Sequence, residues 1–280
     1  MRRATRTAIA THFWLILASI ISIFPIVWVV STSLKYKEDV YQTTRIEVIP
    51  SRPNFSNYVE VLTMNNGIFL TWFRNSALVA GATALFGVLL AASAAYAFSR
   101  FSFRAKKPLI FFFLVTQMFP GAVLLVPLYF LLQRMGLLGS FPGLIIAYCT
   151  VSLPFGVWML KSYFDTIPKS LDEAGIVDGL SIFGVFWRII VPLSLPGIAV
   201  TAFFAFLTAW NEYMFALAFM TGEKNYLLPV GMAAAFGDQY QTFWHLMAAG
   251  SVLTTLPVLA VFVFAQRFLI SGLTQGGVKQ

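Results

Sequence analysis

The sequence is poor in the residues that enzymes and metalloproteins use at their active sites. It contains one cysteine, Cys149, and two widely separated histidines, His12 and His245. A single thiol cannot form an internal disulfide, and no Cys/His group has metal-ligand spacing. The GxxxxGK[ST] phosphate loop is missing, and no nucleophile stands at an interpretable spacing from a base. We therefore expect no catalytic residue, no metal, no cofactor and no ATP site within this chain.

Charged residues are also scarce. Only 11% of the residues are charged and 59% are apolar, whereas about a quarter of a soluble domain is charged. A chain of this composition requires a lipid bilayer, and six apolar runs have the length of a membrane span. We expect an all-α membrane protein with residues 1–280 forming one transmembrane domain, and with spans near 12–34, 71–99, 108–132, 142–164, 193–220 and 245–270.

The positions of lysine and arginine predict the orientation. If the N-terminus is cytoplasmic, twelve of the 19 basic residues lie inside, as the positive-inside rule requires. Both termini and the segment 165–192 would then be cytoplasmic, with outer loops at about 35–70 and 221–244. The net charge of +8 follows from this topology and from contact with anionic lipid, and it does not indicate nucleic-acid binding. The twelve inner residues are Arg2, Arg3, Arg6, Arg100, Arg104, Lys106, Lys107, Lys161, Lys169, Arg188, Arg267 and Lys279.

The segment 165–192 is an amphipathic, acid-bearing stretch between apolar runs. Ser170 and Glu173 have capping-box spacing, which predicts a helix starting at Ser170. Asp178-Gly179 predicts its end, with Gly179 at positive φ. Such a helix has about two turns, roughly 12 Å, and is too short to span a membrane or to be stable alone. It should therefore dock against a partner protein at the membrane surface.

These residues resemble the cytoplasmic EAA loop of binding-protein-dependent ABC importer permeases. The likeness comprises Glu173-Ala174-Gly175, Gly179, Ile189 and Pro192. Gly175 departs from the family's E-A-A triplet; glycine costs about 1 kcal/mol against alanine in a helix but permits a closer approach. Further runs make nearly the whole chain similar to the smaller permease subunit of maltose-type sugar importers: Asp178-Gly179, Pro192–Gly197, Gln117–Pro120, Trp210–Glu212 and Gly272–Lys279.

The resemblance implies a type I permease bundle with a cytoplasmic coupling helix, in the inner membrane of a bacterial or archaeal cell. It implies pairing with a second homologous permease, two ATPase subunits that hydrolyse ATP, and an extracytoplasmic solute-binding protein that the outer loops contact. The imported solute would be a sugar or oligosaccharide. Residues implied to couple to the ATPase are Glu173, Ala174, Gly175, Asp178 and Gly179, with Gly276, Gly277 and Lys279 of the tail 271–280 as a further ATPase contact.

Polar residues within the expected spans are candidates for the translocation path. Asn211 and Glu212 are costly at membrane depth unless they line a water-filled path or have a partner. Either they form a hydrogen-bonding wall flanked by Trp210 and Tyr213, or Glu212 lies near the outer interface or pairs with another subunit. Gln117, before Pro120, marks either a broken helix beside a cavity or a hydrogen bond between helices. Pro192 and Pro196 predict a kink at the start of the fifth span.

Other functions remain open at this point. A secondary transporter would need a titratable group in the membrane, and Glu212 is the evident candidate. An integral membrane enzyme would need a catalytic constellation, and the sequence shows none. An ABC importer of a non-sugar solute, such as a glycerol phosphodiester or a polyol, is the third alternative.

Overall fold

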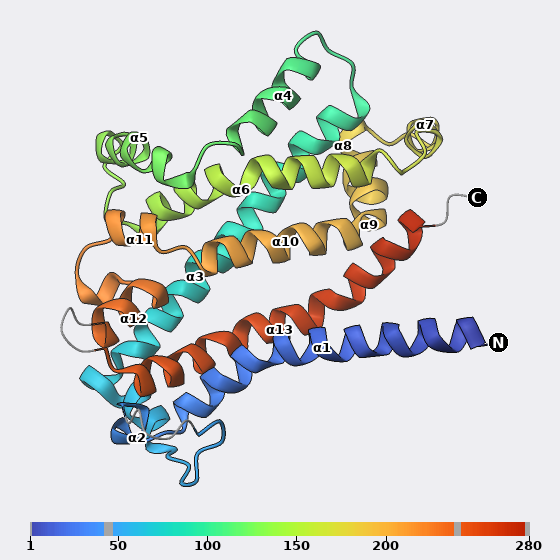
Figure 1. Cartoon of the computed structure of the whole chain (residues 1–280). Helices are drawn as coiled ribbons and strands as arrows, with labels where there is room; N and C mark the ends of the chain where they lie inside the picture. The colour runs from blue at the N-terminus through green and yellow to red at the C-terminus, as the bar shows by residue number, and fades with distance from the viewer. Residues whose placement is uncertain (1, 42–46, 238–241, 278–280) are drawn as a thin grey trace. The chain divides into compact units, whose positions relative to one another are not determined.

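The computed structural model describes the backbone of residues 2–41, 47–237 and 242–277, and side chains within 11–268 of those ranges. The described chain is almost entirely helical; the β pairing it contains is one isolated bridge between Gly237 and Thr242 (Figure 1). The chain divides into two compact units. The first comprises Met1–Thr71 and Gly231–Leu256, and the second Trp72–Val230 and Pro257–Gln280.

The first unit contains the long helix α1 and the segment that follows it. Asn57 ties this segment to the end of α1, because its side-chain amide donates to the carbonyls of Ser33 at 2.9 Å and Lys35 at 2.8 Å. Positive φ angles at Asn65, Asn66 and Gly67 interrupt α3 before its membrane-spanning part. The elements of this unit are α1 (Arg2–Ser33), α2 (Lys37–Tyr41), the start of α3 (Ser56–Arg100), most of α12 (Leu228–Phe236) and the first part of α13 (Trp244–Gly277).

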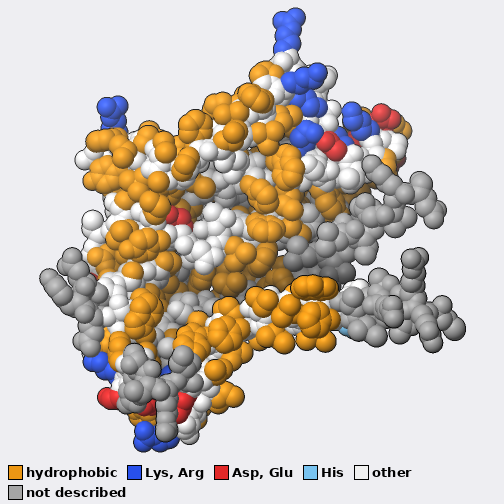
Figure 2. Space-filling model, in the orientation of Figure 1, with side chains coloured by type: hydrophobic (Ala, Val, Ile, Leu, Met, Phe, Trp, Pro, Cys, Tyr) orange, Lys and Arg blue, Asp and Glu red, His pale blue; other side chains and the backbone are white. Residues whose placement is uncertain are grey.

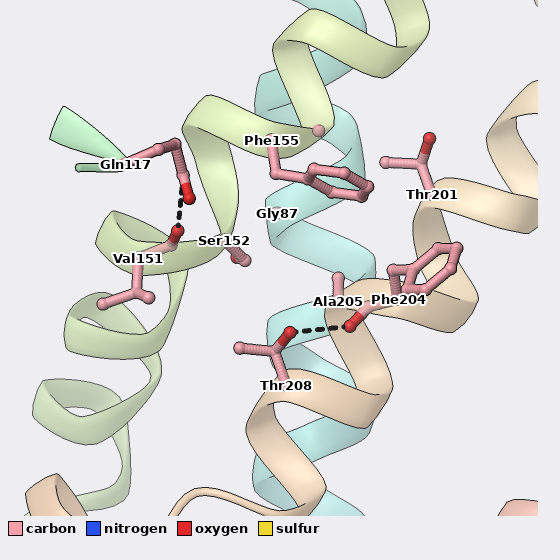
Figure 3. Close-up of a pocket in the computed structure, with 10 residues that line it drawn as sticks. Gly87, Gln117, Val151, Ser152, Phe155, Thr201, Phe204, Ala205 and Thr208 are labelled. Carbon is pink, nitrogen blue, oxygen red and sulfur yellow. Dashed lines mark hydrogen bonds between the residues drawn. The ribbon is translucent and has the colours of Figure 1, made fainter. Parts of the chain in front are cut away.

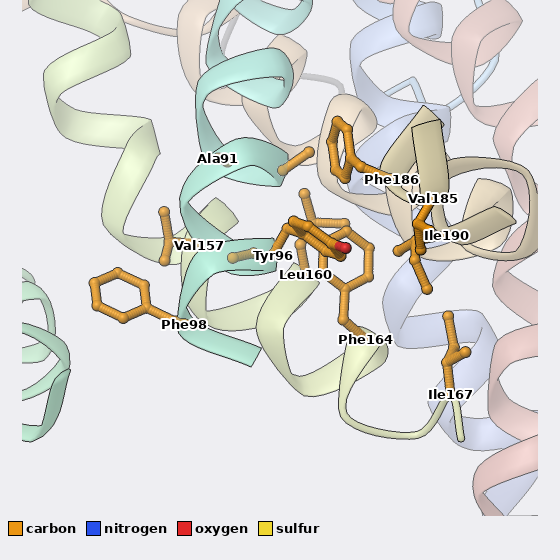
Figure 4. Close-up of a cluster of buried hydrophobic side chains, with 12 residues drawn as sticks. Ala91, Tyr96, Phe98, Val157, Leu160, Phe164, Ile167, Val185, Phe186 and Ile190 are labelled. Atoms are coloured by element: carbon orange, nitrogen blue, oxygen red, sulfur yellow. The ribbon is translucent and has the colours of Figure 1, made fainter. Parts of the chain in front are cut away.

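The second unit is built around α6, which contacts α4, α5, α10 and α11. A buried cluster lies at one end of this unit, where side chains of α3 and α6 meet those of α8 and η1 (Figure 4). Its elements are the rest of α3, α4 (Lys106–Thr116), α5 (Gly121–Arg134), α6 (Phe141–Phe164), α7 (Ser170–Val177), α8 (Ile182–Val185), the π-helical turn η1 (Phe186–Ile190), α9 (Val191–Leu193), α10 (Leu195–Trp210), α11 (Met214–Phe219), the 3₁₀ turn η2 (Glu223–Asn225), the first residues of α12 and the larger, second part of α13.

Apolar helices of spanning length confirm the membrane class. Four helices in the described chain are long and apolar enough to cross a bilayer, and two bent pairs bring the number to as many as six. The bent pairs are Lys106–Thr116 with Gly121–Arg134, at 105°, and Ile182–Leu193 with Leu195–Trp210, at 80°. The second bend confirms the kink expected from Pro192 and Pro196.

The predicted spans 108–132 and 193–220 are each interrupted. The first interruption is the broken helix that one interpretation of Gln117 expected, whereas the second was not expected. The first breaks at residues 117–120, because a proline disfavours helical geometry in the residue before it and Pro120 itself is extended, with ψ 134°. The second ends at Trp210 and resumes at Met214 after three non-helical residues. Apolar composition identified the membrane segments in both cases but not these breaks.

Candidate coupling helix and translocation path

The predicted coupling helix is present as α7, eight residues from Ser170 to Val177. The predicted capping box is wrong, because Lys169 before the helix already has helical angles and no side chain caps the first turn. Backbone carbonyls of the preceding turn accept these amides instead: Leu171 donates to Pro168 at 3.2 Å and Glu173 to Lys169 at 3.1 Å. The Glu173 side chain is therefore not used as a cap and is exposed.

The end of α7 is a complete Schellman motif. Gly179 has φ +87°, as predicted. The amide of Leu180 donates to the Gly175 carbonyl at 2.9 Å and that of Gly179 to the Ile176 carbonyl at 3.0 Å, which is the pair of bonds that defines the motif. No atom lies within 4 Å of a Cβ built on Gly179. The requirement for glycine is therefore one of backbone conformation and not of space.

Gly175 lies on the buried face of α7, where neighbouring side chains leave little room for a side chain. A methyl group at this position would lie 2.6 Å from Ile189 Cδ1 and 3.2 Å from Val185 Cγ2. These neighbours belong to η1 and α8, which also contribute to the buried cluster of the second unit. Glycine therefore provides the close approach that its substitution for alanine was expected to permit.

Arg100 is the residue of this site that the sequence analysis missed, having counted it only as an inner cation. It is the last residue of α3, and its side chain is 7% exposed. Its Nε lies 3.0 Å from Asp172 Oδ2 in α7. Its Nη1 and Nη2 donate to the carbonyls of Phe164 and Ile167, each at 3.1 Å. The sequence pattern that could have indicated this pair is an arginine at the end of one span and an acidic residue in the next inner segment.

Asp165, just beyond α6, joins the same end of α3. Ser99 Oγ donates to its carboxylate at 2.7 Å, and Lys161 forms an ion pair with it. Burial alone would raise the pKa of Asp165, but these hydrogen bonds and the charge of Lys161 hold the pKa below its ordinary value. The ionised carboxylate thus helps to fasten α6 to α3.

The outward side of α7 and α8 carries exposed apolar side chains beside acidic ones. Val177 is 85% exposed and Phe183 is 71% exposed, and Ile176 and Ile182 are also exposed. Charged side chains of both signs gather at this end of the second unit (Figure 2). Apolar patches with a polar rim mark protein interaction sites.

Glu212 lies at the break between α10 and α11. Its carboxylate accepts the amides of Phe215 at 2.9 Å and Ala216 at 3.1 Å, and so caps α11. This is a partner within the chain that the sequence analysis did not consider. The buried Tyr148 hydroxyl lies close enough to Glu212 to interact electrostatically, without a hydrogen bond of standard geometry. Asn211 donates to the Leu207 carbonyl at 3.0 Å.

The aromatic candidates flanking Glu212 differ in exposure. Trp210 is 3% exposed, stacks on Phe206 and meets Phe73 edge-on, so its ring is used in packing in this conformation. Tyr213 is 39% exposed. Of the two, only Tyr213 has a surface open to a solute here.

Gln117 lines a cavity of about 310 Å³ between α3, α6 and α10. Its side-chain amide donates to the Val151 carbonyl at 3.4 Å, so the two interpretations of Gln117 hold together: a broken helix beside a cavity and a bond between helices. The cavity also contains residues that the sequence did not single out, and residues 210–213 are not among the described residues lining it (Figure 3). The new ones with polar or aromatic side chains are Ser152, Thr201, Thr208, Phe155 and Phe204.

The tail lies partly outside the described residues. Helix α13 continues through Gly276 and Gly277, beyond the predicted span 245–270. Lys279 falls outside the described chain. The expected ATPase contact of these three residues stays a prediction.

The fold and these sites define a multi-pass membrane protein of the transport class. Residues 85–275 match the family of binding-protein-dependent transport system inner membrane components, and the chain belongs to this family. It is 35% identical to the inner membrane ABC transporter permease protein YcjP of Escherichia coli K12, over 99% of this chain and 98% of that protein. It is 34% identical to the trehalose/maltose transport system permease protein MalG of Thermococcus litoralis, over 94% of each.

The fold also matches a solved structure. A chain of a bacterial ABC transporter involved in the import of alginate superposes with a TM-score of 0.82, 21% identity, and coverage of 95% of this chain and 98% of that one. At this identity the likeness establishes the permease fold.

Replacing Gly175 by alanine tests the packing of α7. Overpacking costs about 1–3 kcal/mol, whereas alanine gains about 1 kcal/mol of helix propensity over glycine; we expect a net loss of thermal stability in the purified protein. Ile189→Val removes Cδ1, the atom 2.6 Å from the added methyl group. In that background Gly175→Ala should be neutral or stabilising. The same shift of melting temperature in both backgrounds would contradict the contact.

Proposed function

We propose that this chain is a permease subunit of an ATP-driven ABC importer of a sugar or oligosaccharide, with residues 1–280 acting as one permease domain. It would assemble with a second homologous permease, two ATPase subunits and an extracytoplasmic solute-binding protein. One observation carries the proposal: an eight-residue helix, α7, is fixed to a membrane bundle by its inner face while its outer face is exposed. The sequence has no phosphate loop, so the partner subunits must hydrolyse the ATP.

The outer face of α7 suits a cleft in the ATPase. Glu173 and Asp178 supply charge, and Val177 with Phe183 of the neighbouring α8 supplies apolar area. Burying these side chains against a partner would remove apolar surface from water. We infer that α7 is cytoplasmic, and that both termini are too, because basic residues are concentrated in the segments assigned to that side.

The chemistry of the cavity supports a neutral, hydroxyl-rich solute. Gln117, Ser152 and Thr208 offer hydrogen-bonding groups, and Phe155 and Phe204 offer rings on which a sugar face can pack. No lysine or arginine is among the described residues that line it, which disfavours a phosphodiester. The relative from Thermococcus litoralis, named for trehalose and maltose transport, supports the sugar class. Tyr213 and Asn211 would extend the path beyond the cavity.

A secondary transporter is less well supported. Both carboxylate oxygens of Glu212 accept backbone amides at the start of α11. The carboxylate is therefore used to cap α11, which gives Glu212 a structural function in this conformation.

Substitution of Glu212 separates these two functions. Glutamine keeps one acceptor oxygen for the amides of α11, whereas leucine keeps none; losing a cap costs about 1 kcal/mol. We expect Glu212→Gln to retain uptake into proteoliposomes and Glu212→Leu to reduce it. Uptake by the wild-type protein and by the glutamine variant should be unchanged when the proton gradient is collapsed at constant ATP. Loss of uptake in the glutamine variant, together with dependence on the proton gradient, would favour the secondary transporter.

Substitution of Gly179 tests the coupling function. A β-branched residue at φ +87° is strongly disfavoured, so Gly179→Val should misdirect the end of α7 and lower the amount of ATPase that copurifies with the permease pair. Gly136→Val is the matched control, because Gly136 also has positive φ, +68°, with no atom within 4 Å of an added Cβ. It should lower stability but leave ATPase recovery normal. Normal ATPase recovery and normal stimulated hydrolysis in Gly179→Val would contradict the role of α7.

A further inference from the structure

We propose that Arg100 is the positioning residue through which movement of α7 reaches the membrane helices. This inference rests on the proposed function of α7 as the contact with the ATPase. Arg100 ends α3, a membrane-spanning helix, and α7 follows α6, another one. A single side chain therefore stands where two spans and the coupling helix meet.

The guanidinium uses its donors in three directions. Nε faces Asp172 of α7, with Oδ2 at 3.0 Å and Oδ1 at 3.2 Å. Nη1 donates to the carbonyl of Phe164, the last residue of α6, and to Ser99 Oγ at 3.3 Å. Nη2 donates to the Ile167 carbonyl in the turn between α6 and α7. The planar group thus holds α7 and the end of α6 in one orientation relative to α3.

Because the Arg100–Asp172 pair is buried, it is costly to separate and tolerates little change in geometry. The side chains of Arg100 and Asp172 are 7% and 13% exposed, so separating them would leave charges in a poorly solvated place. Apolar contacts such as those around Gly175 can slide, whereas a hydrogen-bonded ion pair breaks when its geometry changes. The other ion pair of the described chain, Lys161–Asp165, lies within a single helical turn and its immediate end. Arg100–Asp172 is thus the one ion pair there that joins α7 to another element.

Two adjacent carboxylates of α7 face in different directions. Glu173 is exposed on the side proposed for the ATPase, and Asp172 is turned toward Arg100. A displacement of α7 by the motor would therefore pull on Arg100 at the next residue, and through Arg100 on the ends of α3 and α6. Contacts of α3 and α6 in the buried cluster extend this connection into the bundle.

The test compares transport per ATP hydrolysed in proteoliposomes that contain the full complex and its binding protein. Arg100→Lys keeps the charge but lacks the fork that reaches Asp172 and two carbonyls together; Asp172→Asn keeps the shape but removes the charge. Each should retain the ATPase at wild-type stoichiometry while transport per ATP falls about tenfold, within the usual range of coupling between sites.

The double variant should be no worse than either single one, because both break the same link. Arg134→Lys, the same substitution at the exposed arginine that ends α5, is the matched control and should keep wild-type coupling.

Two results would overturn the proposal. One is wild-type transport per ATP in Arg100→Lys and Asp172→Asn. The other is loss of the ATPase from both variants, which would make Arg100 a structural residue of the docking site. If instead the unmodified complex fails to bind an ATPase or to couple hydrolysis to uptake, the proposed function itself fails, and this result is distinct from the other two.

Discussion

The structure depends on a helix too short to be stable without its surroundings. Isolated helices below about 12–15 residues are marginal in water, and α7 has eight. Its stability must come from contacts: the Schellman motif at Gly179, the methyl-free face of Gly175, and the pair of Asp172 with Arg100. Each contact also fixes the direction in which α7 points. The same interactions that stabilise the helix therefore give it the firm attachment that the proposed coupling function requires.

The membrane part of the chain is shaped by a second constraint. Backbone groups freed by a break in a span must find partners where water is scarce. At the break after Trp210, Glu212 accepts two amides of α11. At the break before Pro120, the Gln117 side chain donates to the Val151 carbonyl of α6 and so joins the break to a neighbouring helix. Polar side chains at membrane depth thus stabilise the interruptions themselves. The break at residues 117–120 also borders the cavity that Gln117 lines, which is the space proposed for the solute.

Features determined by neighbouring residues could be predicted from the sequence. The apolar runs, the length of α7 and the positive φ of Gly179 all follow from local pattern. The capping box failed because the turn after Pro168 was already helical, so that Ser170 entered the helix instead of preceding it. Arg100 could not be assigned because its partners in α6, in α7 and in the turn between them lie 64 to 72 residues away. Trp210 was expected to flank the translocation path but is packed between Phe73 and Phe206, a contact that only the folded chain reveals.

The central claim is that the exposed face of α7 meets an ATPase in the cytoplasm, and site-specific cross-linking tests it directly. A cysteine replaces Val177, which is 85% exposed, in a Cys149→Ala background, with Ser51→Cys in the outer segment as the control. We predict that Val177→Cys cross-links to the ATPase subunit and is protected from a thiol reagent that cannot cross the membrane, applied from outside. Ser51→Cys should be modified from outside and form no adduct with the ATPase. Labelling of Val177→Cys from outside, or an ATPase adduct formed by Ser51→Cys alone, would contradict the account.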